Sequence, residues 1–179
     1  CTDLIFDLQQ HTAFVSGPMS AFQLRKLTAN VDLVGLRCKT EHFTKLVRIP
    51  LAELKNTRAE LSQVVPHSPA SILSQLIDRP ILEDQIATLR SFVCTLVNEN
   101  DRREDKLVLS VVRKIRLMKG CTSIRDLAAA YHISVRQLER RFRNFLGLTI
   151  KEFVSVVRFN AAKEKINQLT KSLGEISFE

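Results

Sequence analysis

The run from Thr122 to Asn144, TSIRDLAAAYHISVRQLERRFRN, constrains the fold of this chain more than any other stretch. Ser123 is followed three residues later by Asp126, and Ser134 is followed at the same spacing by Gln137. This pattern is typical of a capping box, in which two side chains bond backbone N–H groups at the start of a helix. The sequence therefore predicts two short helices whose starts are 11 residues apart.

Only Tyr131, His132 and Ile133 separate the two predicted helices, which is too few residues for a strand or an open loop. We expect His132 to adopt the left-handed backbone conformation that reverses the chain, because histidine is enriched there among residues other than glycine. Apolar residues share one face of each helix, so the two helices can pack together. These residues are Ile124, Leu127 and Ala128 on the first helix and Leu138, Phe142 and Phe145 on the second.

The opposite face of the second helix is predicted to be cationic. At about 100° per residue, Arg136, Arg140 and Arg143 project away from the apolar side, flanked by Glu139 and Asn144. Arginine can bind phosphate or read guanine through two hydrogen bonds, and glutamate can accept from the amino group of cytosine. We therefore interpret this helix as one that enters a DNA groove. A merely solvated cationic helix is the alternative, and the paired caps and the three-residue turn disfavour it.

Charge is unevenly distributed along the chain. Residues 1–101 contain 10 Lys and Arg against 11 Asp and Glu, whereas residues 102–179 contain 17 against 8, which accounts for the net charge of +8. The segment Asn98–Asp105, NENDRRED, is polar throughout and is predicted to link two modules. We therefore predict two domains, residues 1–101 and residues 102–179, of which the second binds a polyanion.

The first domain is predicted to combine strands with helices. Strands are expected at Thr12–Val15, at Ala21–Leu27 and at Val31–Cys38, where the interior Gly35 indicates a bulge or close packing. From Ile81 to Val97, apolar residues repeat at spacings of four and three, which predicts a long amphipathic helix. Its apolar stripe either packs on its own domain or pairs with the same helix of a second subunit, as a homodimer. With the helical second domain, the fold class is α+β.

The second domain is predicted to continue on both sides of the two short helices. A helix at Lys106–Met118 would supply the third wall that buries their apolar faces. After Gly147, Thr149 and Glu152 form another capping box, which opens a long helix to about Leu169 with an inner apolar stripe. The inner positions are Phe153, Val156, Val157, Phe159, Ala161 and Ile166.

The segment that begins at Ser172 repeats the pattern that begins at Ser123. Both read Ser, apolar, any residue, acid, apolar and small, and they are 49 residues apart, which is room for one helix-turn-helix and a connecting helix. We therefore expect a second such unit to start at Ser172.

The stretch from Ser123 to Glu179 resembles the DNA-binding domain of the AraC/XylS family of bacterial transcription regulators. The resemblance rests on SIRDLAAAYHISVRQLERRFRNFLG, on Arg158-Phe-x-x-Ala162 and on SLGEISFE, and it covers about a third of the chain. It implies two helix-turn-helix units joined by a long helix, with recognition helices in successive major-groove segments. The second recognition helix is expected beyond Glu179.

The resemblance also implies roles for single residues. The positions that match base-facing places are Arg136, Glu139 and Arg140. The positions expected near the DNA backbone are Gln137, Arg141 and Arg143. Arg158 matches an arginine of the connecting helix, which we interpret as structural.

The N-terminal half resembles, less specifically, the β-rich companion domain of these regulators, through Gly17-Pro-Met19 and the strand VDLVGLR. In many members this domain senses a small molecule or dimerises. The resemblance therefore implies a small-molecule effector and only part of such a domain, because its front is missing from these residues.

Other patterns argue against further chemistry. The four cysteines are far apart and form no CxxC or Cys/His pattern, which favours buried, reduced thiols over zinc or disulfides. No cofactor motif, metal cluster, phosphate loop or catalytic triad order is found, so an enzyme is the least favoured hypothesis. Without a spanning apolar run or a leader pattern, we expect a cytoplasmic protein with no membrane partner.

The leading hypothesis is a sequence-specific regulator that binds double-stranded DNA. The alternative is an interaction module that uses the helix at Ile81–Val97.

Overall fold

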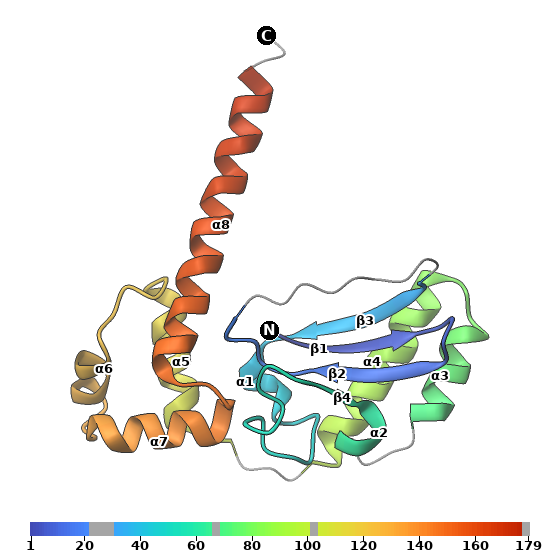
Figure 1. Cartoon of the computed structure of the whole chain (residues 1–179), viewed down its shortest axis with the longest axis horizontal. Coiled ribbons are helices and arrows are strands. Elements are labelled where there is room, and N and C mark those ends of the chain that lie inside the picture. The colour runs from blue at the N-terminus through green and yellow to red at the C-terminus, as the bar shows by residue number, and fades with distance from the viewer. Residues whose placement is uncertain (22–30, 66–68, 101–103, 177–179) are drawn as a thin grey trace. The chain divides into compact units, whose positions relative to one another are not determined.

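The computed structural model describes the backbone of residues 1–21, 31–65, 69–100 and 104–176, and their side chains up to residue 166. The chain divides into two compact units: residues 1–104 with 143–148, and residues 105–142 with 149–179. The described residues combine an antiparallel sheet with helices, so the predicted α+β class is confirmed (Figure 1).

The first unit is built on a four-stranded sheet with the order β3-β1-β2-β4. Its strands are β1 (Thr2–Asp7), β2 (Thr12–Ser16), β3 (Leu33–Cys38) and β4 (Arg58–Glu60), and each neighbouring pair is antiparallel. The sequence pattern predicts β2 and β3 but not the inner strand β1. Three apolar residues in a row, Leu4 to Phe6, hide the alternation that would have marked β1, although only Leu4 and Phe6 are fully buried.

Gly35 lies in an unbroken part of β3, where it pairs with Ile5 of β1. A Cβ atom at Gly35 would come within 2.5 Å of the Leu4 carbonyl oxygen. Of the two expectations for this glycine, close packing is therefore confirmed and a bulge is not. The strand expected at Ala21–Leu27 falls almost wholly outside the described residues.

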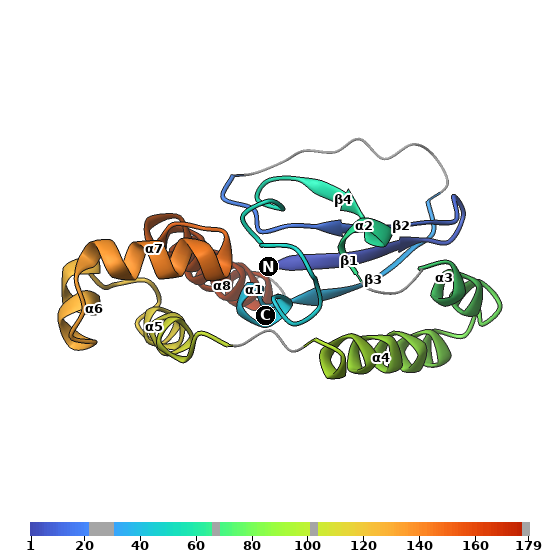
Figure 2. The ribbon, with the colours of Figure 1, turned by 90° about the horizontal axis from the view of Figure 1, so that it is seen from below.

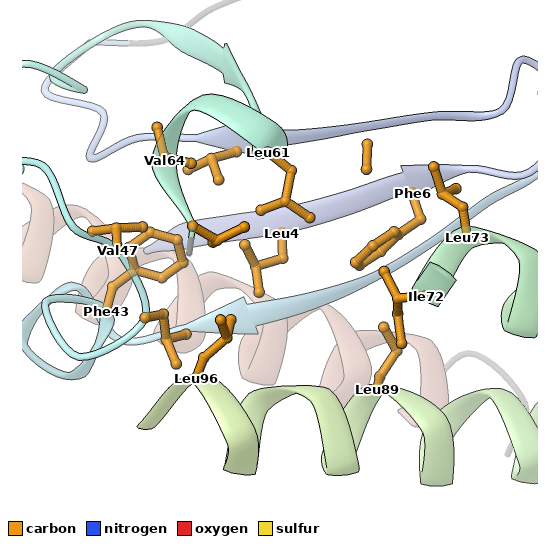
Figure 3. Packing of buried hydrophobic residues seen from close by; sticks show 14 of the residues in the cluster. Leu4, Phe6, Phe43, Val47, Leu61, Val64, Ile72, Leu73, Leu89 and Leu96 are labelled. Atoms are coloured by element: carbon orange, nitrogen blue, oxygen red, sulfur yellow. The ribbon is translucent and has the colours of Figure 1, made fainter. Parts of the chain in front are cut away.

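Two helices cover one face of the sheet, and the core of the first unit lies between the two layers (Figures 1 and 2). They are α3 (Pro69–Ile77) and α4 (Leu82–Asn98), with the short helices α1 (Thr40–Phe43) and α2 (Leu61–Val64) at the edges. Figure 3 shows Phe6 facing Ile72 of α3 and Leu89 of α4, and Leu4 on the same side of the sheet toward Leu96. The rings of Phe6 and Phe92 also meet edge to face, with centroids 6.2 Å apart.

The apolar stripe of α4 divides between two surroundings. Leu89 and Leu96 are each 1% exposed and pack into the core of their own unit. This agrees with the first of the two alternatives for the stripe, packing on its own domain. Leu82 and Ile86 are 59% and 49% exposed. Leu89, Val93 and Leu96 of the stripe therefore pack on their own unit, whereas Leu82 and Ile86 do not.

The second unit consists of helices. They are α5 (Lys106–Leu117), α6 (Ile124–Ala130), α7 (Val135–Leu146) and α8 (Ile150–Ile176), and α7 also supplies residues 143–146 to the first unit. Its buried apolar side chains come from all four helices, so α5 does supply the expected third wall. Among them are Val111 and Ile115 of α5, Leu127 of α6, Leu138 and Phe142 of α7, and Phe153 and Val157 of α8.

Three expectations for α8 are wrong. The helix runs without interruption to Ile176, so it does not end near Leu169, and Ser172 does not begin a separate helix. Phe159 and Ile166 are 68% and 61% exposed and are not part of an inner stripe. Among the described side chains of α8, those up to residue 166, the last buried apolar one is Val157.

No helix in the described part of the chain has both the length and the apolar content needed to cross a membrane.

Candidate nucleic-acid interface

The side-chain caps predicted for the second unit are present. Ser123 Oγ accepts a hydrogen bond of 3.0 Å from the Asp126 backbone N–H at the start of α6. At the start of α7 the box is complete: the Gln137 N–H donates to Ser134 Oγ and the Ser134 N–H donates to Gln137 Oε1, each over 3.2 Å. Local hydrogen bonds therefore set both helix starts, as the spacing indicated.

The turn between α6 and α7 has the conformation expected of it. His132 has a φ of +53°, which is left-handed. The His132 N–H donates to the Ala129 carbonyl and the Ile133 N–H donates to the Ala128 carbonyl, each over 3.1 Å. This pair of bonds is the Schellman motif, which satisfies the last carbonyl groups of a helix. The prediction for His132 is thus confirmed, and α7 starts three residues later.

Helix α7 has one fully buried side and one exposed side. Leu138 and Phe142 are each 0% exposed, and the ring of Phe142 meets that of Phe153 edge to face, with centroids 5.5 Å apart. These contacts anchor α7 on the start of α8. The sequence-predicted contact residues Arg136, Gln137, Glu139, Arg140, Arg141 and Arg143 are all exposed. Arg136, Arg140 and Arg143 lie opposite the buried side, and Gln137, Glu139 and Arg141 lie between the two sides.

The structure separates Arg141 from the other arginines of α7. Its guanidinium donates to both carboxylate oxygens of Asp105, from Nε over 2.8 Å and from Nη2 over 2.7 Å. Within the described residues, no ion pair is found for Arg136, Arg140 or Arg143. Those three guanidinium groups are therefore available to a ligand, whereas Arg141 is engaged within the unit.

Asp105 was not singled out from the sequence, and it has two roles. It is the N-cap of α5, where Oδ1 accepts from the Val108 backbone N–H over 3.1 Å. Partial burial raises the pKa of this carboxyl, but the hydrogen bonds from Arg141 and Val108 and the charge of Arg141 outweigh that effect and lower it overall. An acid just before an apolar helical run could have indicated the cap. Nothing local indicated the ion pair, because its members are 36 residues apart.

Arg158 connects α8 to the turn between α5 and α6. Its Nε donates to the Gly120 carbonyl oxygen over 2.8 Å. This bond agrees with the structural role expected of Arg158, and it fixes the turn that precedes α6.

The cysteines and histidines form no site among the described residues. No group of three or more His, Cys, Asp or Glu side chains there could hold a metal ion. The expectation of buried thiols is wrong: Cys1, Cys94 and Cys121 are exposed, and Cys38 is half-buried. Burial, with the negative charge of Asp3, raises the pKa of the Cys38 thiol, so it stays protonated at neutral pH.

The first unit contains a groove of about 450 Å³ between the β-sheet edge and α3. It has polar residues on the sheet side, including Thr12 and Glu60, and apolar residues of α3, including Leu73 and Ile77. This volume is within the range of about 300–1,000 Å³ that is usual for small-molecule sites.

Comparison with known proteins concerns the first unit only. A family model described as a domain of unknown function (DUF6597) matches residues 1–60, which hold all four strands. No curated protein and no solved structure matches the chain. The helix-turn-helix lies outside the matched residues.

Proposed function

We propose that this protein is a sequence-specific DNA-binding transcriptional regulator of the AraC type, with α7 as a recognition helix in the major groove. The observation that carries the proposal is the two-sided character of α7. Its apolar side is buried against α8, while Arg136, Arg140 and Arg143 stand exposed at spacings of four and three on the other side. A recognition helix needs this arrangement, because base edges can be read only by side chains that are held out rigidly from a packed support.

Two kinds of contact are assigned to this face. Arg136, Glu139 and Arg140 read base edges, since arginine pairs with guanine and glutamate with the amino group of cytosine. Gln137 and Arg143 contact the DNA backbone and set the register. Gln137 keeps its amide N–H groups for a phosphate, because only its Oε1 is used in the cap.

The test is a DNA-binding measurement with sequences selected from random duplexes. The logarithm of the affinity should fall linearly with the logarithm of the salt concentration. Arg140→Ala should lose discrimination at one base position, at a cost of about 1–3 kcal/mol on the preferred sequence. Arg90→Ala, which removes an exposed arginine from α4, is the matched control and should leave the preference unchanged. The proposal would be wrong if Arg140→Ala discriminated between sequences as well as the unaltered protein does.

We further propose that the exposed half of the α4 stripe pairs with a second copy of the chain. Leu82, Ile86 and Val97 are exposed, and Val93, which is partly buried against the core, lies on the same side of α4. The four stand at spacings of four, seven and four. This spacing reads the same in both directions, so an antiparallel pair of α4 helices would place Leu82 against Val97 and Ile86 against Val93. A two-fold symmetric interface must be self-complementary in this way. A homodimer would also present two DNA-binding units together.

Ile86→Asp tests the homodimer. The substitution places a charge in the exposed stripe, so we expect the variant to have the molar mass of one chain and the unaltered protein that of two. Light scattering after size exclusion measures the molar mass, at a protein concentration of about 20 µM, which suits a dimer with a micromolar dissociation constant. Ser91→Asp, which adds the same charge on another exposed side of α4, is the control and should leave the dimer intact. A monomeric unaltered protein, or a dimeric Ile86→Asp variant, would contradict the proposal.

A further inference from the structure

Arg141 and Asp105 join the recognition helix to the start of α5. The contact is bidentate, with both N–H···O distances below 3 Å, and the Asp105 side chain is 19% exposed against 45% for Arg141. A bidentate pair restricts the angle between two groups as well as their distance, because the planar fork of arginine must face the carboxylate edge.

The carboxylate of Asp105 is also tied to the backbone of α5 through its capping bond to the Val108 N–H. One group is therefore shared by the first turn of α5 and the second turn of α7. The apolar contacts of α7 face α8 through Phe142 and Phe153, so the pair restrains α7 from a different side. Rotation of α7 about its own axis would move Arg141 away from Asp105.

We propose that Arg141 is a positioning residue and not a DNA contact: through Asp105 it sets the rotation of α7, and so the direction in which Arg136 and Arg140 point. This inference rests on the proposed function and changes the role that the family resemblance implies for Arg141. Its neighbours Arg140 and Arg143, for which the described residues offer no carboxylate, remain free for DNA.

A phosphate contact by Arg141 would instead require the pair to break on binding. The two roles predict opposite effects of removing Asp105. If Asp105 holds Arg141 in place, its loss weakens DNA binding. If Asp105 competes with a phosphate for Arg141, its loss strengthens DNA binding, because both a competitor and a negative charge near DNA disappear.

The experiment uses Asp105→Ser, Arg141→Lys and the double variant in the full chain. Serine retains the helix cap but is too short to hold Arg141, and lysine retains the charge but not the fork. We expect each single variant to weaken binding to a selected DNA site about fivefold, as loss of one partly exposed ion pair implies. The double variant should bind no more weakly than either single one, because both remove the same contact. The slope of affinity against salt should not change, because no phosphate contact is lost.

Arg113→Lys is the matched control, since it makes the same substitution at an exposed position of α5 for which the described residues show no ion pair. Its affinity should stay within about twofold of the unaltered protein, because no contact between two helices is lost. Tighter binding by Asp105→Ser, or a salt slope lowered by about one unit in Arg141→Gln, would overturn the inference.

A second readout separates failure of this inference from failure of the proposed function. If the unaltered protein binds no DNA, the proposed function fails. The same three variants, measured by urea unfolding, then decide whether the two helices are coupled. A coupling between the two substitutions supports the positioning role within the fold, and additive effects overturn it.

Discussion

Gly120 is the residue at which local conformation and tertiary packing impose the same requirement. Its φ of +79° is left-handed, and it follows Lys119, which is left-handed as well. A Cβ atom there would lie 2.7 Å from Cγ of Arg158 and 3.0 Å from the Val154 carbonyl oxygen. Glycine is needed both for the turn that ends α5 and for the close approach of α8.

We expect Gly120→Ala to lower the free energy of unfolding by about 1–3 kcal/mol, because alanine is strained at positive φ and its methyl group would displace Arg158. Urea unfolding followed by circular dichroism measures the change. Cys121→Ala, at the exposed next residue, is the control and should stay within about 0.5 kcal/mol of the unaltered protein. Equal stability of the two variants would show that α8 does not approach the turn this closely.

The helix starts show how much of an element can be set locally. Ser123, Ser134 and Thr149 cap their helices through partners three residues away, and all three were predictable from spacing. The start of α5 differs, because the carboxylate of its cap, Asp105, also holds Arg141 of another helix. The stability of α5 therefore depends on the ionisation of one carboxyl group.

This dependence predicts an effect of pH. The pKa of Asp105 is lower in the folded protein than its ordinary value of 3.8, so the ionised carboxylate stabilises the fold above that value. The contribution is lost as the pH falls through the folded pKa. Asp105→Ser should thus be less stable than the unaltered protein at pH 7, by less than about 1 kcal/mol because Arg141 is exposed. The difference should shrink below about pH 4. Urea unfolding at pH 7, 5 and 3 tests this, and a constant difference would contradict it.

The whole molecule joins two units of different character. The first unit is an antiparallel sheet with two helices on one face, and its region of the sequence has nearly equal numbers of acidic and basic residues. The second unit is a set of helices, and its region of the sequence holds the excess of positive charge. Exposed apolar side chains occur on both, at Leu82 and Ile86 of α4 and at Phe159 and Ile166 of α8. In α4 they supply the surface for the proposed homodimer.

The sequence was sufficient for features that depend on near neighbours. The caps of α6, α7 and α8, the left-handed His132 and the buried side of α7 follow from spacings of one to four residues. The exposed side of α7 could be named for the same reason, and with it four of the six candidate DNA contacts: Arg136, Glu139, Arg140 and Arg143. Gln137 and Arg141 came only from the family resemblance.

Tertiary structure alone decided what depends on distant partners. It placed Leu89 and Leu96 of α4 in a core but left Leu82 and Ile86 outside, although all four fit one helical stripe. It extended α8 past Leu169, where the pattern of residues suggested a break. It also paired Arg141 with Asp105, so this guanidinium is engaged within its own unit. Periodicity reports which residues share a face, but only the fold determines whether another element reaches that face.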